Sequence, residues 1–132
     1  MTLKKGVKQL VAEANAEIET IPQDRAEALL GDPNVQIVDI RDVRELEREG
    51  MVPGAFHAPR GMLEFWVDPD SPYHKDVFAS GKKFVLYCQS AWRWALATKA
   101  LQDMGLTPVA HLQGGIKAWI EAGGEIDPPR ED

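Results

Sequence analysis

Apolar residues follow two different periodicities along this chain. In five short runs they are consecutive or alternate with polar residues, and many are β-branched or aromatic, which is typical of strands. The predicted strands are residues 17–21, 35–40, 55–58, 84–87 and 108–112. In most segments between these runs, apolar residues recur every three or four positions, as in a helix with one buried face. The predicted helices are residues 3–15, 22–30, 41–49, 61–65, 94–104 and 116–122.

Strands and helices alternate from the first of these elements to the last. Such alternation is typical of an α/β fold, in which helices connect parallel strands and cover both faces of the sheet. We therefore predict one three-layer α/β/α domain built around a mostly parallel sheet. An N-terminal amphipathic helix (residues 1–15) precedes the domain (residues 16–126), and a short tail (residues 127–132) follows it.

Charge and composition restrict the partners of this domain. The formal net charge of the 132 residues is −6, which argues against a nucleic acid or an anionic membrane surface as partner. No apolar run approaches the ~20 residues that a membrane-spanning helix needs. No apolar segment follows the first basic residues, as it would in a signal peptide. We therefore expect a cytoplasmic protein.

The single cysteine, Cys88, has a position that predicts reactivity. One cysteine can form neither an intramolecular disulfide nor a cysteine cluster for a metal. Cys88 directly follows the apolar strand 84–87, and a helix is predicted to begin a few residues later. Open parallel sheets bind ligands beyond the carboxyl ends of their strands, and a helix N-terminus attracts anions and lowers the pKa of a nearby cysteine. The stretch therefore predicts a thiolate with an anion-binding loop around it.

Three separate stretches resemble motifs of the rhodanese (sulfurtransferase) family. The first is Asp39-Ile40-Arg41 followed by Gly50-Met51-Val52-Pro53-Gly54-Ala55, and the second is the loop from Cys88 to Arg93. The third is Leu112-Gln113-Gly114-Gly115 followed by Trp119. Together they cover most of the chain in the order and spacing of the family, so the chain looks like a rhodanese of the single-domain type.

This resemblance implies a five-stranded, mostly parallel sheet and a catalytic role for Cys88. The thiolate attacks the outer sulfur of a donor such as thiosulfate, and the protein keeps that sulfur as a persulfide. An acceptor such as cyanide, a small thiol or a thiol-carrying protein then removes it, so no other cofactor is expected. The residues expected to bind the sulfur donor and the persulfide follow the cysteine: Gln89, Ser90, Ala91, Trp92 and Arg93.

Loop length favours sulfur transfer over phosphoryl transfer. Cys88 and Arg93 are separated by four residues, whereas the related cysteine phosphatases have five, which makes a loop wide enough for a phosphate. A small cysteine phosphatase or arsenate reductase on the same fold is therefore the weaker alternative. Ala91 and Trp92 stand where rhodanese loops more often have glycine and small residues, so a sulfur carrier or partner-binding module with little turnover is another alternative.

Residues beside the loop are expected to support it. Arg60 and Trp94 could reach the pocket, although a surface arginine and a core tryptophan are the competing interpretations. Asp39 and Arg41 are expected to form an ion pair that braces the loop. The histidines show neither ligand spacing nor a second liganding group, so no metal site is predicted at any of them: His57, His74 and His111.

Overall fold

The computed structural model describes residues 2–89 and 93–128. Five strands form one sheet in the order β1-β5-β4-β2-β3, and all four neighbouring pairs are parallel. The strands are β1 (Glu19–Ile21), β2 (Val35–Asp39), β3 (Phe56–His57), β4 (Lys83–Tyr87) and β5 (Val109–Leu112). The predicted fold class is confirmed, and β4, which leads to Cys88, is the central strand.

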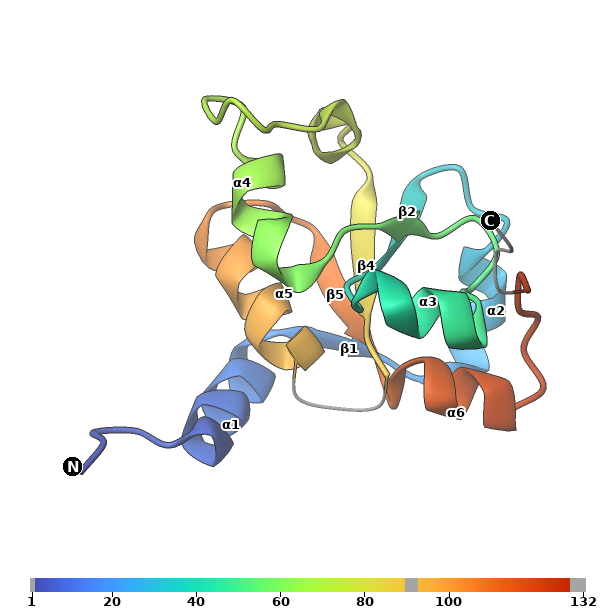
Figure 1. Ribbon diagram of the computed structural model, residues 1–132, viewed down its shortest axis with the longest axis horizontal. Coiled ribbons are helices and arrows are strands. Elements are labelled where there is room, and N and C mark those ends of the chain that lie inside the picture. Colours follow the sequence, from blue (N-terminus) through green and yellow to red (C-terminus); the bar gives the residue numbers. More distant parts are fainter. Residues whose placement is uncertain (1, 90–92, 129–132) are drawn as a thin grey trace.

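Helices cover both faces of the sheet, as Figure 1 shows. The core on one face contains residues of α1 (Val7–Glu17), α4 (Leu63–Val67) and α5 (Arg93–Asp103). The core on the other face contains residues of α2 (Gln23–Leu29) and α6 (Gly115–Glu121). The remaining helices are α3 (Val43–Glu49), which follows β2, and two short 3₁₀ helices, η1 (Arg60–Met62) and η2 (Asp76–Ala79).

The central strand β4 is buried on both of its faces. Phe84, Leu86 and Cys88 belong to the core under α5, whereas Val85 and Tyr87 belong to the core under α6. Successive side chains of a strand point to opposite faces, and a parallel strand covered on both sides has no polar face. The unbroken apolar run of β4 therefore follows directly from its central position.

Helix α3 begins two residues later than predicted, at Val43 instead of residue 41. The Asp42 side chain accepts a hydrogen bond from the Arg44 N–H. Asp42 also forms a capping box with Glu45, in which each side chain accepts a hydrogen bond from the backbone N–H of the other residue. Because the helix starts after Asp42, Arg41 lies outside it and can turn into the protein.

The segment around the predicted start of the tail is held by the domain. Asp127 forms an isolated antiparallel bridge with Met51, in which the Asp127 N–H donates to the Met51 carbonyl (2.8 Å) and the Met51 N–H donates to the Asp127 carbonyl (3.2 Å). The carbonyl of Glu125 also accepts a hydrogen bond from the buried indole of Trp119 (2.6 Å). These contacts attach residues 125–127 to α6 and to the segment after α3.

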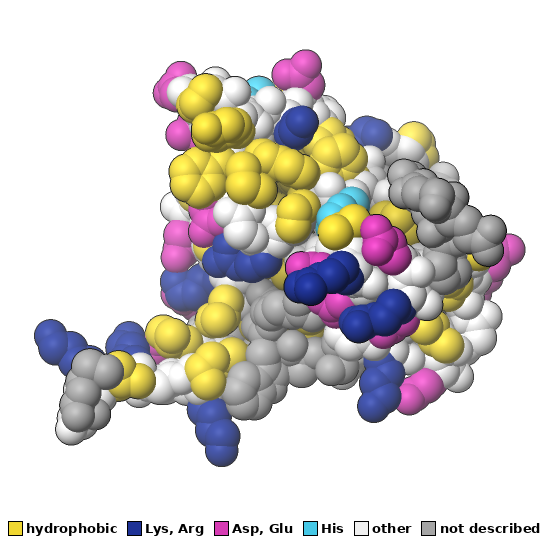
Figure 2. Space-filling view, in the orientation of Figure 1, with side chains coloured by type: hydrophobic (Ala, Val, Ile, Leu, Met, Phe, Trp, Pro, Cys, Tyr) yellow, Lys and Arg dark blue, Asp and Glu magenta, His cyan; other side chains and the backbone are white. Residues whose placement is uncertain are grey.

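Among the described residues, no helix is both long and apolar enough to cross a bilayer. Hydrophobic side chains do gather on the surface over α4, in the upper left of Figure 2. Phe65 and Tyr73 are 53% and 58% exposed, and their rings meet edge to face with centroids 6.4 Å apart.

Candidate active site

Cys88 lies at the carboxyl edge of the sheet, directly after β4. Parallel strands end at the same edge, so β2 brings Asp39 beside β4, where it is the register partner of Tyr87. The Ile40 N–H donates to the Tyr87 carbonyl (3.0 Å), and the Arg60 N–H donates to the Ile40 carbonyl (3.2 Å). Residues that are distant in the sequence therefore meet where an open parallel sheet binds ligands.

The backbone at the thiol is held by the start of α6. The Cys88 side chain is fully buried in the core under α5. The backbone carbonyl of Cys88 accepts a hydrogen bond from the Ile116 N–H (3.0 Å). The Gln89 carbonyl accepts one from the Lys117 N–H (3.0 Å). The first N–H groups of a helix have no partner within the helix, so these loop carbonyls satisfy them. In return, α6 fixes the first two residues of the loop.

Gly115 permits this close approach. Its φ angle is +62°, and a Cβ atom at this position would lie 2.5 Å from the Cys88 carbonyl oxygen. A left-handed backbone costs an ordinary L-residue about 1–2 kcal/mol, and the overlap with the carbonyl adds to this. Gly114 also has a positive φ of +75°, so both glycines contribute to the tight turn between β5 and α6.

Replacement of Gly115 by alanine is expected to lower the free energy of unfolding by about 2–4 kcal/mol, because it combines backbone strain with displacement of Cys88. Gly31→Ala is the matched control, since an added Cβ at Gly31 meets no atom within 4 Å. Urea denaturation at neutral pH measures both changes. An equal loss of stability in the two variants would contradict the role given to Gly115.

The predicted ion pair between Asp39 and Arg41 is present and fully buried. The Arg41 Nη2 lies 2.8 Å from Asp39 Oδ2, both side chains have 0% exposure, and Arg41 Nε lies 3.1 Å from both carboxylate oxygens. Burial disfavours the guanidinium charge, but the hydrogen bonds and the charge of Asp39 outweigh burial and raise the pKa of Arg41. Arg41 therefore stays charged inside the protein.

Arg41 also connects three segments around the thiol. Its Nη2 donates to the Gly50 carbonyl (2.6 Å), and its Nη1 donates to the Gln89 side-chain oxygen (3.4 Å), next to Cys88. The Glu49 carboxylate lies 3.5 Å from Nη1. This arrangement supports the prediction that the pair braces the loop.

The motif that begins at Gly50 also contacts β4. The Val52 N–H donates to the phenolic oxygen of Tyr87 (3.0 Å), and the Arg41 guanidinium carbon lies 5.8 Å from the centre of the Tyr87 ring. Burial raises the pKa of Tyr87, so the phenol keeps its proton. The two parts of the first family-like motif thus meet at Tyr87, the residue before Cys88.

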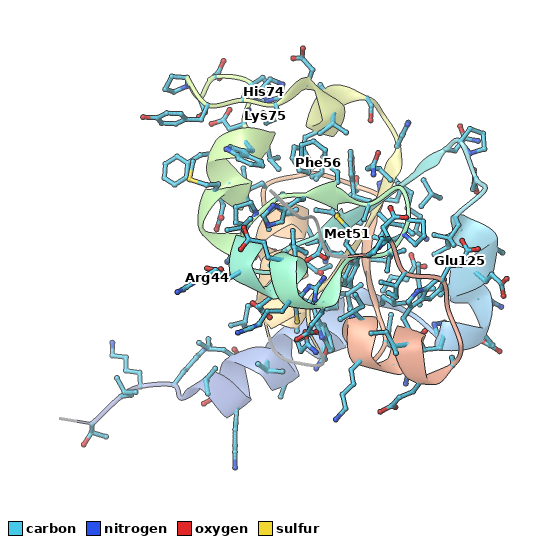
Figure 3. All side chains as sticks on the ribbon, turned by 45° about the vertical axis from the view of Figure 1, so that its right-hand side comes forward. Arg44, Met51, Phe56, His74, Lys75 and Glu125 are labelled. Carbon is cyan, nitrogen blue, oxygen red and sulfur yellow. The ribbon has the colours of Figure 1, made fainter. Side chains whose placement is uncertain are left out.

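Arg60 is less closely integrated than Arg41. Its side chain is 33% exposed and pairs with Glu64 across one turn (2.7 Å). Arg44 on α3 points into solvent, as Figure 3 shows, and forms an exposed pair with Asp42 (3.2 Å). Of these three arginines, Arg41 is the one buried at the carboxyl edge.

A groove of about 450 Å³ runs along α3, and its lining includes Met51, Phe56 and His57. Met51 and Phe56 are labelled in Figure 3. The His57 Nε2 lies 2.7 Å from the Arg41 carbonyl oxygen, so the His57 side chain forms a hydrogen bond with the backbone of Arg41. Of the loop residues that the structure describes in full, neither Cys88 nor Gln89 lines this groove.

Trp94 and His111 form a buried stack that the sequence did not indicate. Their ring centroids are 3.8 Å apart with an interplanar angle of 15°, and the residues are 8% and 1% exposed. Trp94 therefore packs in the core. Burial lowers the pKa of His111 to about 4, although a backbone hydrogen bond at Leu112 partly opposes this shift. The sequence feature that could have indicated this buried histidine is that His111 is the one polar residue in the otherwise apolar strand 109–112.

Because His111 resists protonation when folded, acid is expected to destabilise the protein through this residue. Its pKa is about 4 in the fold and 6.5 ordinarily, so the unfolded chain binds more protons between these values. The free energy of unfolding should therefore fall as the pH drops from 6.5 towards 4, by at most about 1.4 kcal/mol per pH unit from this residue.

Chemical denaturation at pH values from about 7 to about 4.5, the range over which a histidine titrates in the unfolded chain, measures this dependence. His111→Phe keeps an aromatic ring and removes the titrating group, so its pH dependence should be flatter than that of the unmodified protein. The difference between the two curves isolates His111 from the carboxylates, which titrate in both proteins. Parallel curves would contradict the prediction.

Several predicted site residues lie outside the described part of the chain. These are Ser90, Ala91 and Trp92, and the side chain of Arg93 is also not described. The backbone of Arg93 is described as the first residue of α5. Within residues 2–89 and 93–128, no group of three His, Cys, Asp or Glu side chains is arranged to hold a metal ion.

Comparison with known proteins identifies the fold family. A family model described as a rhodanese-like domain matches residues 22–122, a region that contains every predicted site residue. The chain belongs to the rhodanese-like domain family. The resemblance seen in the three motifs is thereby confirmed.

Two solved structures illustrate the range of this rhodanese-like family. A protein of unknown function from Rhodopseudomonas palustris CGA009, described as a possible tyrosine phosphatase, is 54% identical and superposes with a TM-score of 0.93, covering 96% of this chain and 98% of that one. A polysulfide-sulfur transferase homodimer from Wolinella succinogenes is 27% identical, with a TM-score of 0.69, covering 92% of this chain and 86% of that one.

The rhodanese-like domain also resembles part of larger proteins. A tRNA uridine(34) hydroxylase from Brucella anthropi is 33% identical over 114 residues, which are 84% of this chain and 33% of that protein. The chain thus spans about a third of the length of this curated relative.

Proposed function

We propose that this rhodanese-like domain is a sulfurtransferase that carries a sulfane sulfur on Cys88. The observation that carries the proposal is the position of the thiol at the carboxyl end of the central strand, one short loop before the N-terminus of the 11-residue helix α5. The dipole and free N–H groups of a helix N-terminus favour a negative charge there. The buried arginine beside Gln89 supports the same proposal.

The first step loads the protein with sulfur. The Cys88 thiolate attacks the outer sulfur of thiosulfate and forms a new S–S bond, while the sulfur–sulfur bond of the donor breaks. Its electron pair leaves with sulfite, and Cys88 becomes an anionic persulfide. The total charge is conserved, and no external oxidant or reductant is needed. Backbone N–H groups of the loop would bind the persulfide in the manner of an anion nest.

The second step unloads the sulfur. A nucleophile such as cyanide or a thiolate attacks the outer sulfur of the persulfide, and the persulfide S–S bond breaks. The electron pair returns to the Cys88 sulfur, which regenerates the thiolate. With cyanide the product is thiocyanate, and with a thiol it is a new persulfide on the acceptor. The enzyme is therefore chemically unchanged after each cycle.

Phosphatase activity is the second candidate, because the Rhodopseudomonas palustris relative is described as a possible tyrosine phosphatase. The four residues between Cys88 and Arg93 argue against it, since related phosphatases have five.

The hydroxylase relatives act, by name, on a tRNA uridine. Here the net charge of −6 argues against binding of a phosphate backbone, so a small donor is the better proposal.

The test is to incubate the purified protein with thiosulfate and measure its intact mass. We expect one added sulfur atom, located on Cys88 by peptide mapping, and its release as thiocyanate after addition of cyanide. In a parallel assay, an aryl phosphate is offered as a substrate to test for phosphatase activity. Absence of the sulfur adduct together with turnover of the aryl phosphate would refute the proposal, and an adduct that neither cyanide nor a small thiol removes would indicate a sulfur carrier.

A further inference from the structure

The stack of Trp94 on His111 joins the start of α5 to the sheet. Trp94 is the second residue of α5 and follows Arg93 directly, whereas His111 lies in β5 next to the central strand. In the sheet register, His111 is the partner of Leu86 in β4, two residues before Cys88. The stack therefore links the helix after the loop to the strand that lies beside the thiol.

The imidazole side of the stack is held from the opposite strand. His111 is the register partner of Thr20 in β1, and its Nε2 lies 2.7 Å from the Thr20 hydroxyl oxygen. His111 is 1% exposed and its pKa is lowered to about 4, so the ring is uncharged at neutral pH. A neutral, hydrogen-bonded ring between two strands is a firm platform for an indole.

The indole side depends mainly on packing. Trp94 is 8% exposed, and among the described residues its Nε1 has no hydrogen-bond partner. Its backbone carbonyl accepts a hydrogen bond from the Thr98 hydroxyl (2.6 Å), which ties it to the next turn of α5. Within the described part of the chain, the ring of His111 and the surrounding core are thus what locate the Trp94 side chain.

The two ends of the catalytic loop are therefore held by different sets of contacts. At the Cys88 end, α6 and Arg41 hold the loop through Ile116, Lys117 and Gln89. At the other end, the backbone of Arg93 opens α5, and Trp94 anchors that turn on β5. The distance between the thiol and the N-terminus of α5 depends on both sets of contacts.

We infer that Trp94 and His111 are positioning residues, which set the N-terminus of α5 relative to the Cys88 thiol and so promote its ionised form. The field of a helix falls off within its first turn, so a shift of the helix start of about 1 Å alters how strongly it stabilises an anion. The inference rests on the proposed function for its importance in sulfur transfer. Its physical content, the control of thiol ionisation by the stack, can be measured without any sulfur donor.

The test is the pH profile of Cys88 alkylation by iodoacetamide, followed by intact mass in the full chain. We expect Trp94→Leu to move the midpoint of the profile upwards by about one pH unit, so that alkylation at neutral pH is about tenfold slower. His111→Ala should cause a similar shift, and His111→Phe, which keeps a stacking ring, should largely restore the profile. Because the two residues act through one contact, the double variant should shift no further than either single variant.

Leu101→Ala is the matched control. Leu101 is fully buried in the same helix and the same core, about two turns beyond Trp94, so its replacement lowers the melting temperature without touching the first turn. Its alkylation profile should match that of the unmodified protein. The inference is overturned if Leu101→Ala shifts the profile as much as Trp94→Leu, or if Trp94→Leu leaves the profile unmoved.

The sulfur adduct of the unmodified protein with thiosulfate is recorded separately. A missing adduct combined with the shifted profile of Trp94→Leu would refute the proposed function and support the positioning role. An adduct combined with an unmoved profile would support the proposed function and refute the positioning role.

Discussion

Sulfur transfer from thiosulfate to cyanide is expected to fall by at least about 10³-fold when Cys88 is replaced by serine. A serine hydroxyl is not ionised at neutral pH, and an oxygen at this position cannot form the persulfide. The chain has no second cysteine that could take over the sulfur. Thiocyanate formation and intact mass after incubation with thiosulfate measure the loss.

Cys88→Ala separates this chemical effect from an effect on the fold. The Cys88 side chain is fully buried in the core under α5, so serine introduces a buried hydroxyl, at a cost of about 1–3 kcal/mol, whereas alanine leaves a small void. Both variants should be inactive although their melting temperatures differ. Residual sulfur transfer by a folded Cys88→Ala protein would rule out the persulfide on Cys88.

Replacement of Arg41 by methionine is expected to lower the free energy of unfolding by about 3–5 kcal/mol, because it leaves the buried carboxylate of Asp39 without its counter-charge. Arg41 is fully buried, and it also donates to the carbonyl of Gly50 and to the side chain of Gln89. The double variant Asp39→Asn with Arg41→Met should lose less stability than the single variant. Chemical denaturation at neutral pH measures all three proteins.

A second Arg–Asp pair in the same region provides the control. Arg44 and Asp42 have the same spacing in sequence, but their side chains are 82% and 48% exposed. Arg44→Met should therefore change the stability by less than about 1 kcal/mol. If both variants lost a similar amount of stability, burial of the Arg41–Asp39 pair would not be the cause of the large effect at Arg41.

Arg41→Met should also slow sulfur loading by at least about tenfold in the fraction that remains folded. The contact from Arg41 to Gln89 holds the start of the loop together with the two hydrogen bonds from α6, and a misplacement of about 1 Å at a reacting group is costly. Single-turnover loading at a temperature well below the melting point measures this effect. Loading at the unmodified rate would show that α6 alone holds the loop start.

The sequence predicted the main layout of this protein for reasons that are local. Apolar runs identified the five strands of the described region, and helical periodicity, with the charge-rich run at residues 41–49, identified its six α-helices; the short 3₁₀ helix η2 was missed. Helix α3 was placed too early, because the capping box at Asp42 competes with the apparent continuity of the charged run. The motif at Asp39 and Arg41 correctly indicated an ion pair, since two opposite charges beside a strand end must be paired if they are buried.

Other features depend on which segments meet in space. Asp39-Ile40-Arg41 and Asp42-Val43-Arg44 share the same Asp-x-Arg spacing, yet the Arg41 side chain is fully buried and that of Arg44 is 82% exposed. The close contact of Gly115 with the Cys88 carbonyl arises because α6 begins at the carboxyl edge of the sheet. Contacts of this kind follow from the order of the strands, which no periodicity in the sequence reports.

From the sequence alone one obtains an α/β domain of the rhodanese type, with a single cysteine at a strand end and an arginine that follows it after four intervening residues. Periodicity, composition and motif spacing can be read in this way because they are properties of neighbouring residues. The tertiary structure decided how the ends of that loop are held. β4 lies at the centre of the sheet, between β2, which Arg41 follows by two residues, and β5, which contains His111. These strands are far apart in the chain, and only parallel pairing brings their side chains to the two sides of Cys88.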